Sequence, residues 1–473
     1  MPSRNSPKFI DAIETSNRWQ ELCDLHLPIT PVNSLWRFSR FHSENDPDQG
    51  WKLHISATLR SATSVFEQIG SFLQHSDTLF KAPKNLEELS KLNCGMYYGY
   101  PQIGKCFTVY PRNSEHCVTL ARQLHELTIN FDGPVIPFDR RLKAGSNVFY
   151  RYGSFKRQSV HDMDGTELLA IRSPDGVLVP DSRTDVGDEL EGRPDPFLQK
   201  KTFSPSSNSS TSLLKTRFRV FKALSQRGKG GVYKAIDLGS SKPRFCILKE
   251  GRKHGESGWD GRDGFWRIRT ENKNLSALRK LNIDVPEVYG SFQTSNNFYV
   301  ATEFISGVSL EKLLRLRQRR LPISQVVRYS IQLANILSQF HGNGWVWRDC
   351  KPANLIVSGS GFLRPIDFEG ACRIDELDPL PLGTLLYLPE NTERELMAPA
   401  HPSIDLFAMG VVIHYLLTGH FPTSSTVANL RKNRRGIPTS ILSVVTALLS
   451  SNADARPSAQ LVARELENTS SGG

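Results

Sequence analysis

The sequence predicts an α+β protein built from two domains, and three observations support this. Its 473 residues exceed what one core normally holds, at about 150 residues per domain. Residues 204–212 read SPSSNSSTS, a polar run that cannot bury enough surface to offset its ordering entropy. The chain after this run reads first as strands and then as helices. We therefore expect domains at 1–200 and 215–468, joined by a serine-rich linker at 201–214.

Composition describes a globular chain with a basic balance. Hydrophobic residues make up 38% and charged residues 23%, which excludes wholesale disorder. Lys plus Arg number 59 against 48 for Asp plus Glu, and the net charge of +11 favours anionic partners such as nucleotides, phosphorylated groups, acidic peptides or nucleic acid. Apolar runs stay below the roughly 18 residues that span a membrane. The seven cysteines form no CxxC pair, so we expect neither disulfides nor zinc, and a cytoplasmic location.

Local patterns in the second half place strands before helices. The segments that read as strands are 218–223, 232–237, 244–249 and 298–304. Residues 324–340 and 404–417 place apolar residues at i, i+3 and i+4 spacing, which predicts helices. This order predicts a small strand-rich lobe, then a helical lobe, with a cleft between them.

The sharpest local signal lies at residues 347–354 (WRDCKPAN), followed by 367–370 (DFEG). Asp349, a lysine two positions on, an asparagine five positions on and a second aspartate eighteen positions on are the parts that align a hydroxyl and hold magnesium triphosphate. This spaced set resembles the catalytic loop and the metal-binding loop of protein kinases.

The resemblance implies a two-lobed protein-kinase fold that uses ATP and Mg²⁺. Asp349 would accept or orient the proton of the attacking hydroxyl, and Lys351 would offset charge on the transferring phosphoryl group. Asn354 and Asp367 would ligate Mg²⁺ through hard oxygen atoms. The ATP-binding residues that the pattern implies are Gly228, Gly230, Lys249 with its ion-pair partner Glu271, and Glu303 at the hinge.

The glycine-rich loop departs from the kinase pattern. It spans residues 225–232, and Ser225 and Arg227 stand where the first two glycines are expected. Gly230 alone is in register. We therefore expect a shifted turn to cradle phosphate, with Arg227 or Lys229 supplying charge.

Two further departures lie in the catalytic and metal-binding loops. Trp347 replaces the usual histidine, at a packing position, and Glu369 replaces the usual glycine and adds a carboxylate near the metals. These altered loops leave open the alternative that the chain is a pseudokinase, an inactive kinase fold that serves as a scaffold. The presence of all the catalytic residues favours an active kinase.

The first half carries basic groups on strand-like and turn-like segments. Lys52 and His54 are two residues apart, so on a strand they share one face, which could line a pocket. Arginine and lysine side chains suit a phosphate dianion. A solvated basic surface, or a nucleic-acid contact, is the plain alternative. The other basic residues of this kind are Lys81, Lys105, Arg140, Arg141 and Arg151.

Five short motifs follow one another in this half: 50–57 (GWKLHISA), 79–81 (LFK), 104–111 (GKCFTVYP), 133–136 (GPVI) and 150–155 (YRYGSF). In this order they resemble the lyase half of class III and IV lanthipeptide synthetases. Those enzymes carry a lyase half directly before a kinase half, and the Asp-Phe-Glu variant of the metal-binding loop also resembles their kinase. The resemblance implies a lyase-like α+β domain over about residues 35–200.

The resemblance also implies a reaction: phosphorylation of Ser or Thr in a precursor peptide, then β-elimination of phosphate to dehydroalanine or dehydrobutyrine. By resemblance to phosphothreonine lyases, Lys81 is the candidate base and His54 the candidate acid. A lysine base must be neutral when it acts, which burial or neighbouring cations favour by lowering its pKa. Nothing in the sequence decides between Arg140 and Arg141. The residues expected to hold phosphate are Lys52, Lys105, Arg140, Arg151 and Tyr152.

Synthetases of this family continue into a cyclase domain, whereas this sequence ends at Gly473. We expect a precursor peptide as partner. Either a separate cyclase then forms the rings, or the rings form without a cyclase, or this chain is a divergent relative that acts on another client. Membrane and nucleic-acid partners are not expected. Two other functions stay open. A Ser/Thr kinase with an inactive N-terminal docking domain would leave a stable phosphopeptide, and a pseudokinase scaffold would fail to bind Mg-ATP.

Overall fold

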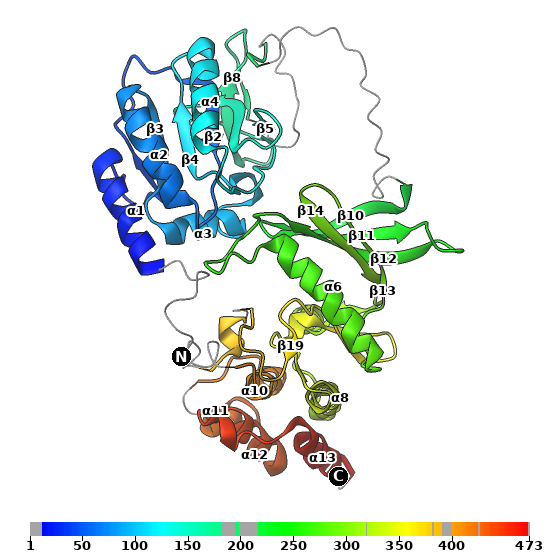
Figure 1. Ribbon diagram of the computed structural model, residues 1–473. Helices are drawn as coiled ribbons and strands as arrows, with labels where there is room; N and C mark the ends of the chain where they lie inside the picture. The colour runs from blue at the N-terminus through cyan, green and yellow to red at the C-terminus, as the bar shows by residue number, and fades with distance from the viewer. Residues whose placement is uncertain are drawn as a thin grey trace.

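The computed structural model describes residues 12–181, 194–197, 216–317, 319–380, 383–389, 399–423 and 426–471. The predicted linker at 201–214 lies outside these residues. Helices and sheets occur in both halves of the chain, so the predicted α+β class is confirmed (Figure 1). Within the described residues, no helix is both long and apolar enough to cross a membrane.

A six-stranded antiparallel sheet forms the centre of the first half. Its strand order is β1-β3-β4-β2-β6-β5. The strands are β1 (Trp36–Phe38), β2 (Gln49–Ile55), β3 (Leu79–Pro83), β4 (Phe107–Tyr110), β5 (Arg140–Arg141) and β6 (Val148–Ser154). A separate three-stranded sheet holds β7 (Ser159–His161), β8 (Glu167–Arg172) and β9 (Leu178–Pro180).

Helices cover one face of the six-stranded sheet and leave the other for a site. They are α1 (Ala12–His26), α2 (Ala62–His75), α3 (Leu86–Cys94) and α4 (Ser114–Thr128). The short 3₁₀ helix η1 (Tyr100–Gln102) instead contributes Gln102 to the open face. Trp19 of α1, Phe66 of α2 and Phe107 of β4 are fully buried against one another, with ring centroids 5.2 to 5.8 Å apart. Because strand side chains alternate, the residues between these core positions face the opposite side.

The second half begins with a five-stranded sheet in the order β10-β11-β12-β14-β13. Its strands are β10 (Phe218–Arg227), β11 (Gly230–Asp237), β12 (Arg244–Arg252), β13 (Val288–Gln293) and β14 (Asn297–Glu303), and α6 (Gly264–Lys280) packs on it. The four strands expected in this region are confirmed. Helix α6 starts where Asp263 accepts the backbone N–H of Trp266, a standard N-cap.

A helical lobe follows. Its helices are α7 (Leu310–Leu316), α8 (Ile323–Gly342), α10 (Ser403–Thr418), α11 (Thr426–Asn433), α12 (Thr439–Leu448) and α13 (Ala459–Ser471). Short strands β15 (Val308–Ser309), β16 (Trp345–Val346), β17 (Leu355–Val357), β18 (Leu363–Pro365) and β19 (Cys372–Arg373) and the 3₁₀ helices η2 (Pro352–Asn354), η3 (Leu385–Tyr387) and η4 (Ala453–Ala455) connect them. The helices predicted at 324–340 and 404–417 are confirmed as α8 and α10. The predicted order of a strand-rich lobe before a helical lobe therefore holds (Figure 1).

The two halves meet at the turn between β10 and β11. The backbone N–H of Gly228 donates to the carbonyl oxygen of Cys94 at 2.9 Å, at the end of α3. A Cβ atom on Gly228 would lie 1.7 Å from the carbonyl oxygen of Asn93, so only glycine allows this approach. In Figure 1 the β10–β11 hairpin reaches from its sheet to α3. The turn thus packs directly on the end of α3, and we call this contact between Gly228 and Cys94 the seat of the turn.

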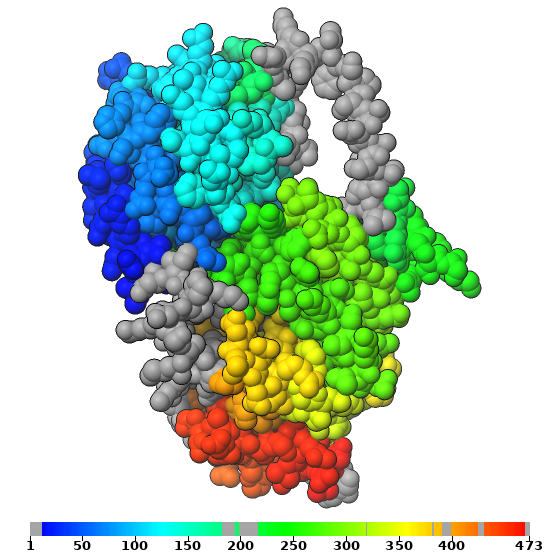
Figure 2. Space-filling model, in the orientation of Figure 1, coloured from blue at the N-terminus to red at the C-terminus, as the bar shows by residue number. Residues whose placement is uncertain are grey.

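Side chains at the end of β12 and after it extend this contact. The guanidinium of Arg252 lies 5.2 Å from the ring centroid of Tyr100, and His254 Nε2 lies 3.4 Å from an oxygen of Asp132. Trp259 packs against the hydrophobic core of the first half. The space-filling view shows the blue and cyan residues of the first half in continuous contact with the green residues of the second (Figure 2).

Replacing Gly228 by Ala should separate the turn from its seat, because the added Cβ collides with backbone rather than with a movable side chain. We expect a loss of about 1–3 kcal/mol of stability, the usual cost of overpacking, measured as a lower midpoint of thermal unfolding. The matched control is Gly342→Ala at the end of α8, where a Cβ meets no atom within 4 Å. An unchanged midpoint for Gly228→Ala, with the control also unchanged, would show that the seat does not form.

Candidate functional site

A chain of ion pairs crosses the cleft between the two lobes of the second half. Lys249 of β12 donates from Nζ to Glu271 Oε1 of α6 at 2.6 Å and to Asp367 Oδ1 at 3.0 Å. Burial by itself would lower the pKa of Lys249, but the Asp367 and Glu271 carboxylates outweigh it and raise that pKa. The structure therefore brings together three residues that the sequence pattern assigned to ATP and metal binding.

The catalytic-loop candidates lie side by side and share hydrogen bonds. Lys351 Nζ contacts the two carboxylate oxygens of Asp349 at 2.8 and 2.9 Å and Thr384 Oγ1 at 2.9 Å. Asn354 donates from Nδ2 to Asp349 Oδ2 at 2.6 Å and to its backbone oxygen at 3.0 Å. Burial raises the pKa of Asp349 above its ordinary value, even though Lys351 acts to lower it. Thr384 is a neighbour of Asp349 that the motif spacing does not predict.

The backbone of these loops is strained, and buried hydrogen bonds hold it in place. Arg348 and Asp367, which flank the site, have φ angles of 68° and 69°, in the left-handed region that costs about 1–3 kcal/mol for such residues. The Asp405 carboxylate of α10 accepts the backbone N–H groups of Trp347 and Arg348 at 2.8 and 2.7 Å. Asp405 is completely buried, so the helical core fixes the catalytic loop.

Trp347, in place of the usual histidine, packs as expected and also makes a hydrogen bond. Its ring is fully buried and stacks on Phe340 and Phe368, with centroids 6.3 and 5.9 Å away. Its Nε1–H donates to the backbone oxygen of Asp367 at 3.0 Å. An indole at this position therefore ties the catalytic loop to the metal-binding loop.

The glycine-rich loop is a two-residue hairpin turn at Gly228 and Lys229, with Arg227 paired to Gly230 across it. Gly230 has a φ of 153°, and a Cβ there would lie 1.7 Å from the carbonyl oxygen of Glu250. A side chain at this position would therefore disrupt the hairpin.

The Glu303 side chain is engaged at the end of β14. It pairs with Arg364 of β18 at 2.6 Å and so links the two lobes where the hinge begins. This ion pair leaves only its backbone for the expected contact with adenine.

The donor set of the cleft suits a hard cation. Asp367 offers a carboxylate that is 30% exposed, and Asn354 uses its amide nitrogen on Asp349, so its amide oxygen remains as a ligand. Carboxylate and carbonyl oxygens are the ligands that Mg²⁺ prefers. Asp367 and Asn354 would thus hold Mg²⁺ with the nucleotide phosphates.

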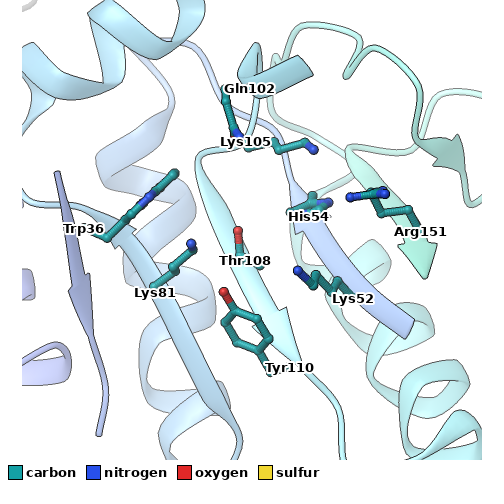
Figure 3. Close-up of a pocket in the computed structure, with 9 residues that line it drawn as sticks. All are labelled: Trp36, Lys52, His54, Lys81, Gln102, Lys105, Thr108, Tyr110 and Arg151. Atoms are coloured by element: carbon teal, nitrogen blue, oxygen red, sulfur yellow. The ribbon is translucent and has the colours of Figure 1, made fainter. Parts of the chain in front are cut away.

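The second candidate site is a cavity of about 60 Å³ on the open face of the six-stranded sheet (Figure 3). Strand pairing explains its lining: His54 and Lys81 both pair with Thr108, and Lys52 pairs with Arg151. Paired residues in antiparallel strands point to the same side. The lining comprises Trp36, Lys52, His54, Lys81, Gln102, Lys105, Thr108, Tyr110 and Arg151.

Amines converge on this cavity, as Figure 3 shows for Lys52, Lys81 and Lys105. Burial, followed by the charges of Lys81 and Arg151, lowers the pKa of Lys52 well below its usual value. Lys81 Nζ lies 4.3 Å from the ring centroid of Trp36, a cation–π distance. Among the described residues, the lining of the cavity thus holds three lysines and an arginine but no carboxylate, which suits a dianion.

His54 is held by a carboxylate that the sequence did not single out. Its Nδ1 lies 2.5 Å from Asp139 Oδ2, and both side chains are buried. Lys105 Nζ lies 3.4 Å from the other Asp139 oxygen. A carboxylate only accepts, so Nδ1 carries the hydrogen. Burial lowers the pKa of His54 to about 3, with Lys105 acting in the same direction and Asp139 against it.

Two predicted phosphate ligands lie outside the cavity. Arg140 pairs with Tyr150, and Tyr152 neighbours Arg151 on β6, so both occupy the sheet face opposite the cavity. Arg140 Nη1 instead bonds Asp195 at 2.5 Å, and Tyr152 packs edge-on against Trp51. Register places Arg141 on the cavity face, over the Phe149 ring, but it is not part of the lining.

The lining residues that the sequence analysis missed are Trp36, Gln102, Thr108 and Tyr110. Thr108 and Tyr110 lie two apart within the motif at 104–111, so strand alternation could have flagged them. Trp36 and Asp139 come from segments distant in sequence and carry no local signal.

Comparisons with known proteins agree with this division of the chain. The family model "RamC, N-terminal domain" matches residues 30–209, and the model "Protein kinase domain" matches residues 218–466. A probable SapB synthase from Streptomyces coelicolor is 31% identical over 342 residues, covering 70% of this chain and 36% of that protein.

Two serine/threonine-protein kinases each match a little under half of this chain. Kinase F from Synechocystis is 29% identical over 44% of this chain and 45% of its own length. PknL from Mycobacterium tuberculosis is 27% identical over 45% of this chain and 52% of its own length. The chain thus spans 36% to 52% of the length of these relatives.

The buried His54 gives a test by pH. Because its folded pKa of about 3 lies below the unfolded value of 6.5, the unfolded chain binds the extra proton between these pH values, and stability falls as pH falls. One such group contributes a slope of at most about 1.4 kcal/mol per pH unit. We expect His54→Gln to reduce the slope of the unfolding free energy against pH, between pH 4.5 and 6, by up to that amount. Denaturant titration measures the free energy at each pH. The exposed His75→Gln is the control, and equal slopes for both variants would contradict the buried neutral imidazole.

Proposed function

We propose that this chain, which belongs to the protein kinase family and carries a RamC-type N-terminal domain ahead of its kinase domain, phosphorylates Ser or Thr in a peptide and then eliminates the phosphate. The observation that carries the proposal is the presence, in one polypeptide, of a phosphoryl-transfer cleft and of a separate cavity lined by amines beside a buried His–Asp pair. The first site would make the phosphoester that the second consumes.

In the kinase cleft, Asp349 orients the hydroxyl of the peptide and accepts its proton. Lys351, held by Asp349 and Thr384, faces the transferring phosphoryl group and offsets its charge. Protein kinases use ATP and Mg²⁺ in general, and bound Mg-ATP would supply the phosphoryl group and neutralise its charge. Asp367, Asn354 and Lys249 position that nucleotide.

In the N-terminal cavity, the elimination breaks two bonds of the phosphorylated residue. A base removes the Cα proton, the Cβ–O bond breaks, a Cα=Cβ double bond forms and phosphate leaves with the bonding electrons. The product is dehydroalanine from phosphoserine or dehydrobutyrine from phosphothreonine. Cations that hold the phosphate stabilise the charge that develops as it leaves.

Lys81 and His54 stand two strands apart, on either side of Thr108. Neighbouring strands are spaced about 4.8 Å apart, so the backbones carrying base and acid lie about 10 Å from each other. This separation leaves room for a phosphorylated side chain between Lys81 as base and His54 as acid. Lys52, Lys105 and Arg151 would hold the phosphate.

Burial keeps His54 neutral, and this must change for it to act as an acid. A phosphate dianion would neutralise the surrounding cations and favour a proton on Nε2. Asp139, which already accepts from Nδ1, would then stabilise the imidazolium. Asp139 therefore acts as a positioning residue for His54.

Replacing Lys81 by Ala tests the elimination half. It removes the proposed base without touching the kinase cleft, so phosphorylated peptide should accumulate while elimination slows by about 10² to 10⁴-fold. Intact-mass analysis after incubation with peptide and Mg-ATP separates a gain of phosphate from a loss of water. The exposed Lys143→Ala is the control. Dehydration by Lys81→Ala at the native rate would remove Lys81 from the mechanism.

Asp349→Asn tests the order of the two steps. This variant should leave an unmodified peptide unchanged, yet it should still eliminate phosphate from a synthetic phosphopeptide, because the cavity does not contain Asp349. Mass spectra of both reactions give the result. If the native protein phosphorylates peptide but never eliminates, it is a Ser/Thr kinase with a docking domain; if it binds no Mg-ATP, it is a scaffold.

A further inference from the structure

The backbone N–H groups at the tip of the β10–β11 hairpin, in the kinase domain, already donate to protein acceptors. In protein kinases the glycine-rich loop covers the phosphates of ATP. Here the N–H of Gly228 donates to Cys94 of the N-terminal domain at 2.9 Å, and the N–H of Lys229 donates to Glu256 Oε2 at 3.3 Å. These two amides, at the tip of the loop, are directed to protein acceptors rather than to the cleft. A different group must supply the positive charge there.

The Lys229 side chain reaches the cleft instead. Its Nζ lies 2.5 Å from Glu369 Oε1, two residues after Asp367. Glu369 is 6% exposed, and its second oxygen, Oε2, is buried without a hydrogen-bond partner among the described residues. A lysine of the glycine-rich loop and the glutamate that replaces the usual glycine of the metal-binding loop therefore meet in one ion pair.

This pair stands beside the charges that position the nucleotide. Glu369, the partner of Lys229, follows Asp367 by two residues in the metal-binding loop. Lys249 contacts Asp367 directly at 3.0 Å. Lys229 thus approaches from the hairpin, the side from which the loop covers the triphosphate.

We propose that Lys229 is a second phosphate-binding lysine of the kinase cleft, and that Glu369 is the counter-ion it releases when the nucleotide phosphates bind. This inference rests on the kinase domain binding ATP, and it assigns to that site a residue outside the shared kinase pattern. The two anions compete for one ammonium group, so Glu369 holds the place of phosphate until nucleotide arrives.

The backbone of the turn is fixed, so the exchange needs only side-chain movement. The carbonyl oxygen of Lys229 accepts the N–H of Arg252 at 2.9 Å, and Gly264 approaches it so closely that a Cβ there would lie 1.7 Å away. A lysine side chain has four rotatable bonds and three donors, and it can turn from a carboxylate to a phosphate without moving the hairpin.

Equilibrium binding to the full-length chain tests the proposal, with ATP and adenosine titrated separately by calorimetry, with and without Mg²⁺. Lys229→Met keeps the length of the side chain and removes its charge. We expect it to weaken ATP binding about 10-fold, the effect of one charge-assisted contact, and to leave adenosine binding within twofold. Glu369→Gln should act in the opposite direction and tighten ATP binding about threefold or more, because it removes the competitor. Lys222→Met, exposed on β10, is the matched control and should change neither.

Opposite signs for the two variants, confined to ATP, support the proposal. Unchanged ATP affinity in Lys229→Met overturns it, as does an equal loss for ATP and adenosine, which would mean a distorted cleft. Weaker binding in Glu369→Gln only when Mg²⁺ is present would make Glu369 a metal ligand and also overturn it. A native protein that binds no ATP would reject the proposed kinase function itself, whereas native binding with unaltered variants would reject this inference alone.

Discussion

Burying a lysine ammonium group is costly unless an anion accompanies it, and both sites of this protein are organised by that constraint. In the kinase cleft each of three partly buried lysines has its carboxylate: Lys249 has Glu271 and Asp367, Lys229 has Glu369, and Lys351 has Asp349. The cleft is therefore nearly balanced before any ligand arrives. Under our proposal, phosphates that enter the cleft exchange with carboxylates, so the geometry of these ion pairs governs nucleotide binding.

The N-terminal cavity resolves the same constraint differently. Lys52 lies beside Lys81 and Arg151, and burial together with these neighbours depresses its pKa instead of giving it a full counter-charge. The carboxylates of the region lie at its edges, with Asp139 on His54 and Asp181 on Arg151. A cavity with this excess of positive charge favours a dianion strongly, and it lowers the cost of a neutral lysine that can remove a proton. This difference in charge supports our proposal that the two sites act in successive steps on one phosphate.

The contact between the halves joins the two sites mechanically. The turn that carries Lys229 is seated on the end of α3, where Gly95 closes the helix with a φ of 76°. Gly228 approaches the backbone at Asn93 so closely that the seat has no room for adjustment. The N-terminal domain thus contacts the tip of the β10–β11 hairpin, which carries Lys229 towards the kinase cleft.

Sequence by itself determined the α+β class and the strand-then-helix order of the kinase half, because both follow from local periodicity. Through spacing and resemblance to the kinase pattern it also predicted roles for Lys249, Asp349 and Asp367, which remain predictions. It also assigned Lys52 and His54 to one strand face, because alternation is a local rule.

Only the tertiary structure decided which distant residues join them. Strand register placed Arg151 in the cavity and moved Arg140 and Tyr152 to the opposite face, since adjacent residues of a strand point to opposite sides. Asp139 reached His54, and Glu369 reached Lys229, from 85 and 140 residues away in sequence. Such pairings depend on how sheets and lobes pack, and because a buried charge selects its partner by distance in space, the spacing of residues along the chain could not reveal them.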